Sequence, residues 1–142
     1  MAANSRFAVA THLLTSLALV QRDPEAQRPA SSSFLAESVN TNPIVVRRLL
    51  GQLREAGLVE EHAGRHGGAS LARPAEQITL CDIWLAVGER ALFAYNANKP
   101  NPACPVSCRM QTLLAPVFAS VSETVEARLR EIRLADLVAE LR

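Results

Sequence analysis

Two cysteines, Cys104 and Cys108, have the residue type and the spacing for redox chemistry on a pair of thiols. Cys108 is expected in the first turn of a long helix with Arg109 beside it, and helix N–H groups and a nearby cation both stabilise a thiolate. Cys104 could then act as the resolving thiol. Because a disulfide within a helix strains its geometry, oxidation is predicted to unwind that turn. Two reduced cysteines without a role are the alternative in a reducing cytosol.

Other chemistry for these cysteines has less support. A thiol redox enzyme would be expected to carry C-x-x-C among alternating strands and helices, whereas this chain has CPVSC without that alternation. A zinc site would need a histidine, and His62 and His66 fall on a different predicted element at a spacing that does not specify a metal. We therefore predict no catalytic residues and no metal ligands.

A second group of residues could read DNA. Arg47 and Arg48 lie on a short predicted helix, away from its apolar positions. Arginines there neutralise phosphates and can pair bidentately with guanine edges. We expect Arg47 and Val45 to probe base edges, with Thr41 and Arg48 near phosphate or base. A solvated charged face is the alternative reading of the same arginines.

Two helices joined by a tight polar turn must hold these arginines. Short polar side chains over 40–42 compete with the helix for backbone hydrogen bonds, so the first helix is expected to end there. Asn42 caps the second helix and Pro43 takes its first position, where the missing N–H costs nothing. The candidate N-caps of the first helix are Ser31, Ser32 and Ser33. The apolar spacing assigns the following residues to the core: Phe34, Leu35, Val39, Val46, Leu49, Leu50 and Leu53.

A two-stranded wing is predicted after the second helix. Gly57 is expected to end that helix in the left-handed conformation. Strands are then expected over 58–62 and 70–73, with the glycine-rich tip 64–68 between them. A glycine-rich loop could instead hold a nucleotide phosphate, but the Walker lysine is absent and no helix follows directly.

The order helix, turn, helix, wing is a way of placing one helix in the major groove of DNA. The second helix then reads bases, while its flanks hold the DNA backbone or the minor groove. The residues predicted for these flanking contacts are Arg6, Ser31, Ser32, Ser33, Asn42, Pro43, Arg65 and His66.

Shorter helices flank this segment. Ser5 is expected to cap a first helix that runs to about Gln21. Thr79 is expected to cap another short helix, on which Trp84 serves as a core or interdomain anchor. The terminal sequence LADLVAEL is expected to form a last short helix that closes over a dimer seam.

A long amphipathic helix is predicted over about residues 106–133, with a length of roughly 40 Å. The preceding loop, residues 96–105, holds three prolines and three asparagines and cannot propagate a helix or a strand. A winged region of this size cannot cover the whole apolar stripe of the helix, so a second copy of the helix is the expected cover. A two-fold homodimer would also bring two DNA-reading helices to two half-sites. The predicted interface residues are Met110, Leu114, Val117, Val121, Val125 and Leu129.

Length and composition set the wider limits. The chain has 142 residues, of which 49% are hydrophobic, and its net charge of +1 excludes a generally basic nucleic-acid coat. No apolar run could span a membrane and no signal-peptide layout is present, so a cytoplasmic protein without a membrane partner is expected. We predict a mainly α fold with a small β wing. It comprises a winged helix-turn-helix domain over 1–78, then a helical linker, a sensor loop (96–105) and dimerisation helices over 79–142.

Several segments together resemble bacterial regulators of the Rrf-two family. SRFAVATHLL resembles the opening helix of the family, and LAESVNTNPIVVRRLLGQLREAGLV resembles its helix-turn-helix. GRHGGASLARPAEQITLCDIW is similar to its wing and linker, while NPACPVSCRMQ and IRLADLV are similar to its sensor loop and terminal helix. The resemblance covers nearly the whole chain. It implies a dimeric winged-helix transcription factor, usually a repressor, that binds an imperfect palindrome in double-stranded DNA.

The same resemblance bears on the cofactor and on the operator. Several members hold an iron–sulfur cluster with three cysteines in the loop before the long helix, whereas this chain has only Cys104 and Cys108 there. Gln111 stands where one member has a histidine ligand. Because thiolates normally supply most ligands of such clusters, no cofactor is expected. A cluster that senses redox state or nitric oxide stays as the alternative. The base-reading position of the family is Arg47 here and acidic in one member, so the operator is expected to differ.

Overall fold

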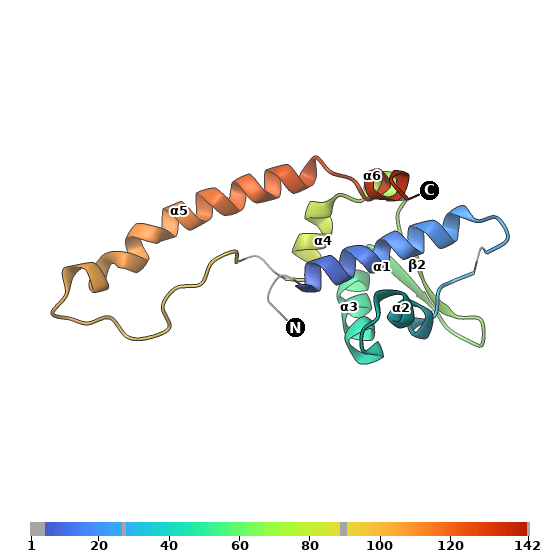
Figure 1. Ribbon diagram of the computed structural model, residues 1–142, viewed down its shortest axis with the longest axis horizontal. Helices are drawn as coiled ribbons and strands as arrows, with labels where there is room; N and C mark the ends of the chain where they lie inside the picture. Colours follow the sequence, from blue (N-terminus) through green and yellow to red (C-terminus); the bar gives the residue numbers. More distant parts are fainter. Residues whose placement is uncertain (1–4, 27, 89–90, 142) are drawn as a thin grey trace.

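Helices make up most of the structure, a computed structural model that describes residues 5–26, 28–88 and 91–141 (Figure 1). One two-stranded antiparallel sheet accompanies them within these ranges. The elements follow in the order α1 (Ser5–Arg22), α2 (Ser32–Val39), α3 (Pro43–Glu55), β1 (Val59–His62), β2 (Gly68–Leu71), the 3-10 turn η1 (Ala75–Gln77), α4 (Leu80–Ala86), α5 (Pro105–Arg130) and α6 (Leu134–Ala139).

The helix-turn-helix has the caps that the sequence predicts. The side chain of Ser31 accepts a hydrogen bond from the backbone N–H of Phe34 across 3.1 Å. Asn42 accepts one from the N–H of Ile44 across 2.9 Å, and Pro43 occupies the first position of α3. Asn40 ends α2 in the left-handed conformation, at φ 56°, which asparagine tolerates better than most residues. The two helices therefore begin and end where their polar residues satisfy free backbone groups.

The core assignments for these two helices hold with one exception. Leu35 and the four predicted α3 residues are buried, and Val39 packs against them. Phe34 was predicted to be buried, and this is wrong, because its side chain is 50% exposed. In an eight-residue helix only a narrow stripe faces the core, and Leu35 with Ala36 fills it. Phe34 falls on the edge of that stripe.

The wing follows α3 as predicted. Gly57 adopts φ 75°, and β1 pairs with β2 in a register that sets Val59 opposite Leu71 and His62 opposite Gly68. The return strand begins at Gly68, two residues before the predicted start at 70, and it ends at Leu71 rather than at Arg73.

The core includes residues from both predicted domains. Leu13, Leu14 and Leu17 of α1 are buried together with Ile83 of α4 and Leu134 of α6. In Figure 1, α1 lies between the helix-turn-helix and α6. The last helix was expected to close over a dimer seam, but it packs against α1 and η1 of its own chain.

One local contact starts α4, and one ring contact packs it against α1. Thr79 forms a capping box with Asp82, as its N-cap position predicts. The ring of Trp84 meets that of Phe7 edge-on, with ring centroids 5.5 Å apart. Trp84 is therefore the anchor that the sequence predicts, and its partner lies on α1.

Helix α5 projects away from the rest of the chain (Figure 1). None of its 26 residues is fully buried, and only its C-terminal end, through Leu129, packs against the core. The loop before it contacts the helix through two aromatic rings: Phe93 stacks on Phe118 with centroids 4.9 Å apart, and the tilted ring of Tyr95 lies 5.2 Å from Phe118. Among the described residues, we find no helix that combines the length and the apolar character that a membrane crossing requires.

Candidate nucleic-acid interface

The outer face of α3 offers one apolar and two cationic side chains to a groove. Arg47 and Arg48 are both exposed, as predicted. Val45, which we expected at base edges, is half-buried and packs against the core. Ile44 takes its place on the surface, where it is 60% exposed. This surface can neutralise phosphate, pair with guanine and contact a thymine methyl group.

Sequence reasoning missed Ile44, although a signal for it exists. At 100° per residue, Ile44 lies about 200° around the helix from Val46, on the side away from the core. A large apolar residue at that angle, just after Pro43 at the helix start, cannot join the stripe of Val46 and Leu49. The angular position of Ile44 on the helix therefore predicts its exposure, whereas its apolar residue type would predict burial.

A hollow of about 420 Å³ separates α2 from the wing tip. Ser31 and His66, both predicted to contact DNA, line it together with Phe34 and Arg28. The structure thus brings the N-cap of α2 and the tip of the wing to one concave surface. Arg28 was not among the predicted contact residues, because it lies in the loop before α2, where no helical spacing assigns side chains to a face.

Backbone pairing fixes the wing beside this hollow. Ala30 and Ala69 form an isolated antiparallel bridge with hydrogen bonds of 2.9 and 2.8 Å. Across the hairpin, the ring of His62 lies within 2.8 Å of the hydroxyl of Ser70. The predicted tip residues Arg65 and His66 are both exposed on this anchored hairpin.

Several polar residues of α1, α2 and α3, predicted contact residues among them, already have partners within the chain. The guanidinium of Arg6 donates to the side-chain oxygen of Gln52 across 2.8 Å, which ties the start of α1 to α3. Arg54 pairs with Glu61, which ties the end of α3 to the wing. The oxygens of Ser31 and Asn42 accept from backbone N–H groups, so these residues position α2 and α3. The remaining predicted residues lie as follows: Ser33 is exposed at the start of α2, Ser32 and Thr41 are half-buried, and Pro43 is exposed at the start of α3.

The two loop cysteines cap the start of α5. Cys104 is the N-cap, and its sulfur accepts from the backbone N–H of Ser107 across 3.5 Å. The thiol of Cys108 donates to the carbonyl oxygen of Asn101 across 3.4 Å. Both thiols are free, and Cys108 is exposed.

The three cysteines of one chain do not lie together in a single metal site within the described residues. Across the described residues, no three side chains of histidine, cysteine, aspartate or glutamate lie together as a possible metal site. The third cysteine, Cys81, is buried on α4 within the winged region. Burial raises the pKa of its thiol, while nearby Arg130 lowers that pKa and Glu126 and Asp82 raise it.

The predicted dimer residues divide into three groups. Met110, Val117 and Val121 are exposed on α5, together with Val106 and Leu113, which were not among the predicted residues. Leu114 and Val125 are half-buried. Leu129 lies against the core of its own chain. The free apolar stripe therefore occupies the N-terminal two thirds of the helix.

Comparison with known proteins places this arrangement in a family. A chain of similar length, YwnA of Bacillus subtilis (strain 168), is 38% identical over 139 residues, which cover 97% of this chain and 98% of YwnA. The structure is similar to that of T. potens IscR, with a TM-score of 0.70 and 22% identity over 97% of this chain and 86% of that one. It is also similar to the oxidised form of Staphylococcus aureus CymR, with a TM-score of 0.66 and 25% identity over 97% and 96%.

The model of the family described as "Rrf2: Iron-dependent Transcriptional regulator" matches residues 3–140. The match confirms the resemblance drawn from the sequence and spans the helix-turn-helix, the wing and the long helix. This family is one of transcriptional regulators rather than of enzymes. The chain is a DNA-binding transcriptional regulator that belongs to the Rrf2 family.

Proposed function

We propose that the protein is a homodimeric repressor that binds an imperfect palindrome in double-stranded DNA. The proposal rests on the outer face of α3, where Ile44, Arg47 and Arg48 are all exposed. A helix of this kind fits the major groove, and a hairpin beside it reaches the adjacent backbone. Because such a protein acts on chromosomal DNA, we place it in the cytoplasm.

The second subunit is proposed as the cover of α5. The exposed stripe, Val106, Met110, Leu113, Val117 and Val121, recurs at spacings of three and four residues along the free part of the helix. A continuous apolar stripe of this kind favours pairing with the same helix of another subunit. Two-fold pairing would present two α3 helices to two half-sites.

Contacts are divided between bases and backbone. Arg47 and Ile44 read base edges, Arg48 reads base or phosphate, and Arg65 and His66 on the wing hold the backbone or the minor groove. Arg6, Ser31 and Asn42 position α3 and α2 through the hydrogen bonds that already engage them.

The test is Arg47→Ala, measured on duplexes that the wild-type protein selects from a random-sequence pool. Preference for the selected sequence should fall by about tenfold or more, while affinity for unrelated DNA changes little. Arg109→Ala is the matched control, because Arg109 is also an exposed arginine but lies on α5, outside the helix-turn-helix. Equal loss on selected and unrelated DNA would contradict base reading by Arg47.

A response to thiol oxidation is the second candidate function, favoured by the bonds at the start of α5. The Cys108 thiolate attacks a peroxide oxygen, which breaks the O–O bond and leaves a sulfenic acid and hydroxide. The sulfur of Cys104 then displaces the sulfenic hydroxyl to form the S–S bond, so one peroxide becomes two waters. Formation of this bond removes the Cys104 cap and the Cys108 bond to Asn101, so the first turn of α5 opens.

Peroxide treatment of the full chain tests this response. The mass should fall by two hydrogens and affinity for the selected duplex should drop, and both changes should be absent in Cys104→Ser and in Cys108→Ser. Unchanged affinity of the oxidised protein would contradict the proposal. A visible absorption band of the anaerobically purified protein would favour the alternative of a cluster shared between subunits.

A further inference from the structure

A cavity of about 600 Å³ lies on the side of the winged region where α1, the segment after β2 and α6 meet. Its apolar wall consists mostly of small side chains, among them Ala18, Ala75 and Ala135, which leave the space unfilled. Its volume falls within the range of about 300–1,000 Å³ that is typical of small-molecule sites. The helix-turn-helix and the loop cysteines do not contribute to it.

Two arginines from different elements line this cavity. Arg22 comes from the last turn of α1 and Arg73 from the segment after β2. Among the residues that the structure describes, Arg22 makes no side-chain hydrogen bond or ion pair. One carboxylate, that of Glu76, also lines the cavity, so the charge of the lining is positive.

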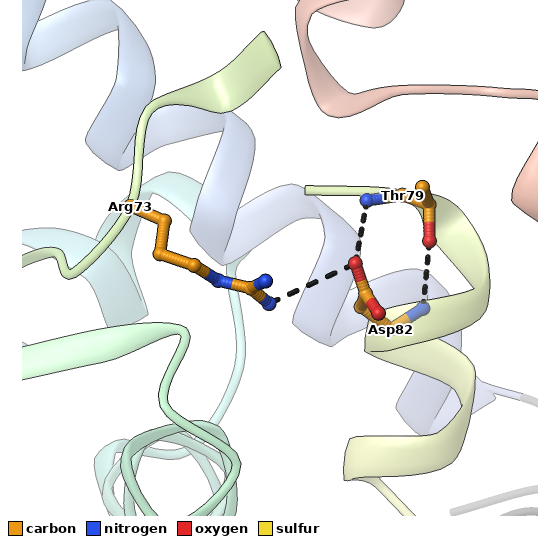
Figure 2. Close-up of polar contacts among 3 residues, drawn as sticks. All are labelled: Arg73, Thr79 and Asp82. Carbon is orange, nitrogen blue, oxygen red and sulfur yellow. Dashed lines mark hydrogen bonds and ion pairs between the residues drawn. The ribbon is translucent and has the colours of Figure 1, made fainter. Parts of the chain in front are cut away.

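The guanidinium of Arg73 has an ion-pair partner, the carboxylate of Asp82 (Figure 2). Its Nε is buried without a hydrogen-bond partner, within the described part of the chain. Its terminal nitrogen lies 3.7 Å from the carboxylate of Asp82, beyond the roughly 2.7–2.9 Å of a charge-assisted hydrogen bond. The same carboxylate oxygen already accepts from the backbone N–H of Thr79 across 2.9 Å. The terminal nitrogens of Arg73 are therefore held only loosely by Asp82 and can donate to another acceptor.

We propose that this cavity binds a small organic carboxylate with an apolar body. The carboxylate accepts hydrogen bonds from Arg22 and Arg73, since the planar guanidinium fork matches carboxylate geometry. The apolar body lies on the wall formed by Ala18, Ala75 and Ala135.

The site is placed to act on DNA binding, and this part of the inference rests on the proposed function. One wall continues from β2 of the wing, and another belongs to α6, which follows α5 in the chain. Backbone bonds from Leu134 to Ile78 and from Leu80 to Ile132 tie the start of α6 to the start of α4. A ligand in the cavity would contact α1, the end of β2 and α6 at once. It would therefore couple the wing to α6 and, through α6, to the dimerisation helix α5.

Nuclear magnetic resonance of the 15N-labelled full chain tests the site, with benzoate and hexanoate as probes. At least one of the two should shift the amide signals of Ala75 and Ala135 saturably, with a dissociation constant of about 1 mM or below. Benzyl alcohol and hexanol have the same apolar bodies without the charge, and they should bind about tenfold more weakly or worse.

Two variants and a control complete the test. Arg22→Gln and the cavity-filling Ala135→Leu should each weaken binding by about tenfold or more. Arg28→Gln should leave it unchanged, because Arg28 is exposed and lies outside the cavity. The Ala135→Leu variant could fail to fold. Arg22→Gln changes an exposed side chain and should fold, so it tests the site in that case. Equal binding of the neutral analogues, shifts confined to α5, or no saturable shift with either acid up to about 10 mM would overturn the site.

A DNA measurement separates the two proposals. Saturating benzoate or hexanoate, whichever binds, should change the affinity of the wild-type protein for its selected duplex, and Arg22→Gln should abolish that change. If the protein binds the carboxylate but selects no DNA sequence, the proposed function fails and the site stands. If it selects DNA but shows no saturable carboxylate binding, the site fails and the proposed function stands.

Discussion

Ala30, in the segment that leads into α2, and Ala69, in the wing strand β2, exchange two backbone hydrogen bonds of 2.9 and 2.8 Å. This bridge joins the segment before α2 to the wing, two parts of the candidate DNA-binding surface that are distant in the sequence. Gly68 makes the close approach possible, since a Cβ on it would lie 2.4 Å from the carbonyl oxygen of Ala30. Gly68 also adopts φ 153°, within the region that L side chains rarely enter.

Gly68→Ala is therefore expected to open this bridge. Unfolding free energy should fall by about 2 kcal/mol, because the substitution adds a steric clash to an unfavourable backbone conformation. Affinity for selected and unrelated duplexes should fall by the same factor, since the wing is proposed to contact the DNA backbone and not the bases. Thermal unfolding and fluorescence anisotropy measure the two effects. Gly64→Ala is the matched control, because Gly64 also has a positive φ but has open space around its Cβ position. Similar losses in both variants would contradict the role given to the bridge.

Ile44→Ala is expected to change sequence preference without changing stability. The side chain is 60% exposed, so its loss should alter the unfolding free energy by less than about 0.5 kcal/mol. If Ile44 contacts a thymine methyl group, the preference at one base pair should weaken by roughly 1 kcal/mol. Selection from a random-sequence pool measures that change. An unaltered base preference in the variant would remove Ile44 from the base-reading residues.

The local features of the fold could be predicted because each has a cause close by in the sequence. Asn42 and Pro43 mark the start of α3, and Thr79 marks the start of α4, through backbone groups only a few residues away. The four buried residues of α3 follow from helical spacing alone. Gly57 follows from the need for a left-handed residue after the helix.

Features set by distant contacts could not be predicted in the same way. Leu129 continues the apolar stripe of α5 in the sequence, yet it packs against the core of its own chain. Helix α6 folds back onto α1 because Leu134 and Val138 fill a space there, which the sequence of α6 does not reveal. The carboxylate cavity likewise depends on where three distant segments meet. Its arginines have no common spacing that a reader of the sequence could recognise.

Val117→Asp is expected to disrupt the proposed dimer. A carboxylate in an apolar seam loses hydration without gaining a partner, so association should weaken by a factor of about 100 or more. Sedimentation velocity measures the change, and affinity for a palindrome should fall far more than affinity for one half-site. Ala119→Asp is the matched control, since Ala119 is exposed on the opposite side of the same helix. A Val117→Asp protein that still sediments as a dimer would exclude the exposed stripe as the interface.

The three cysteines are expected to react with iodoacetamide at different rates, and Cys81 should be the slowest. Its thiol is buried, and burial raises its pKa above the ordinary value of 9.0, so little of the reactive thiolate forms at neutral pH. Cys108 is exposed and should react first, with Cys104 between them, as peptide mass spectrometry can measure. The raised pKa also implies that stability falls as pH rises above about 9, because the unfolded chain then loses the Cys81 proton before the folded one does. Cys81→Ala should lack that part of the pH dependence. Modification of Cys81 in the native protein as fast as that of Cys108 would contradict the buried placement.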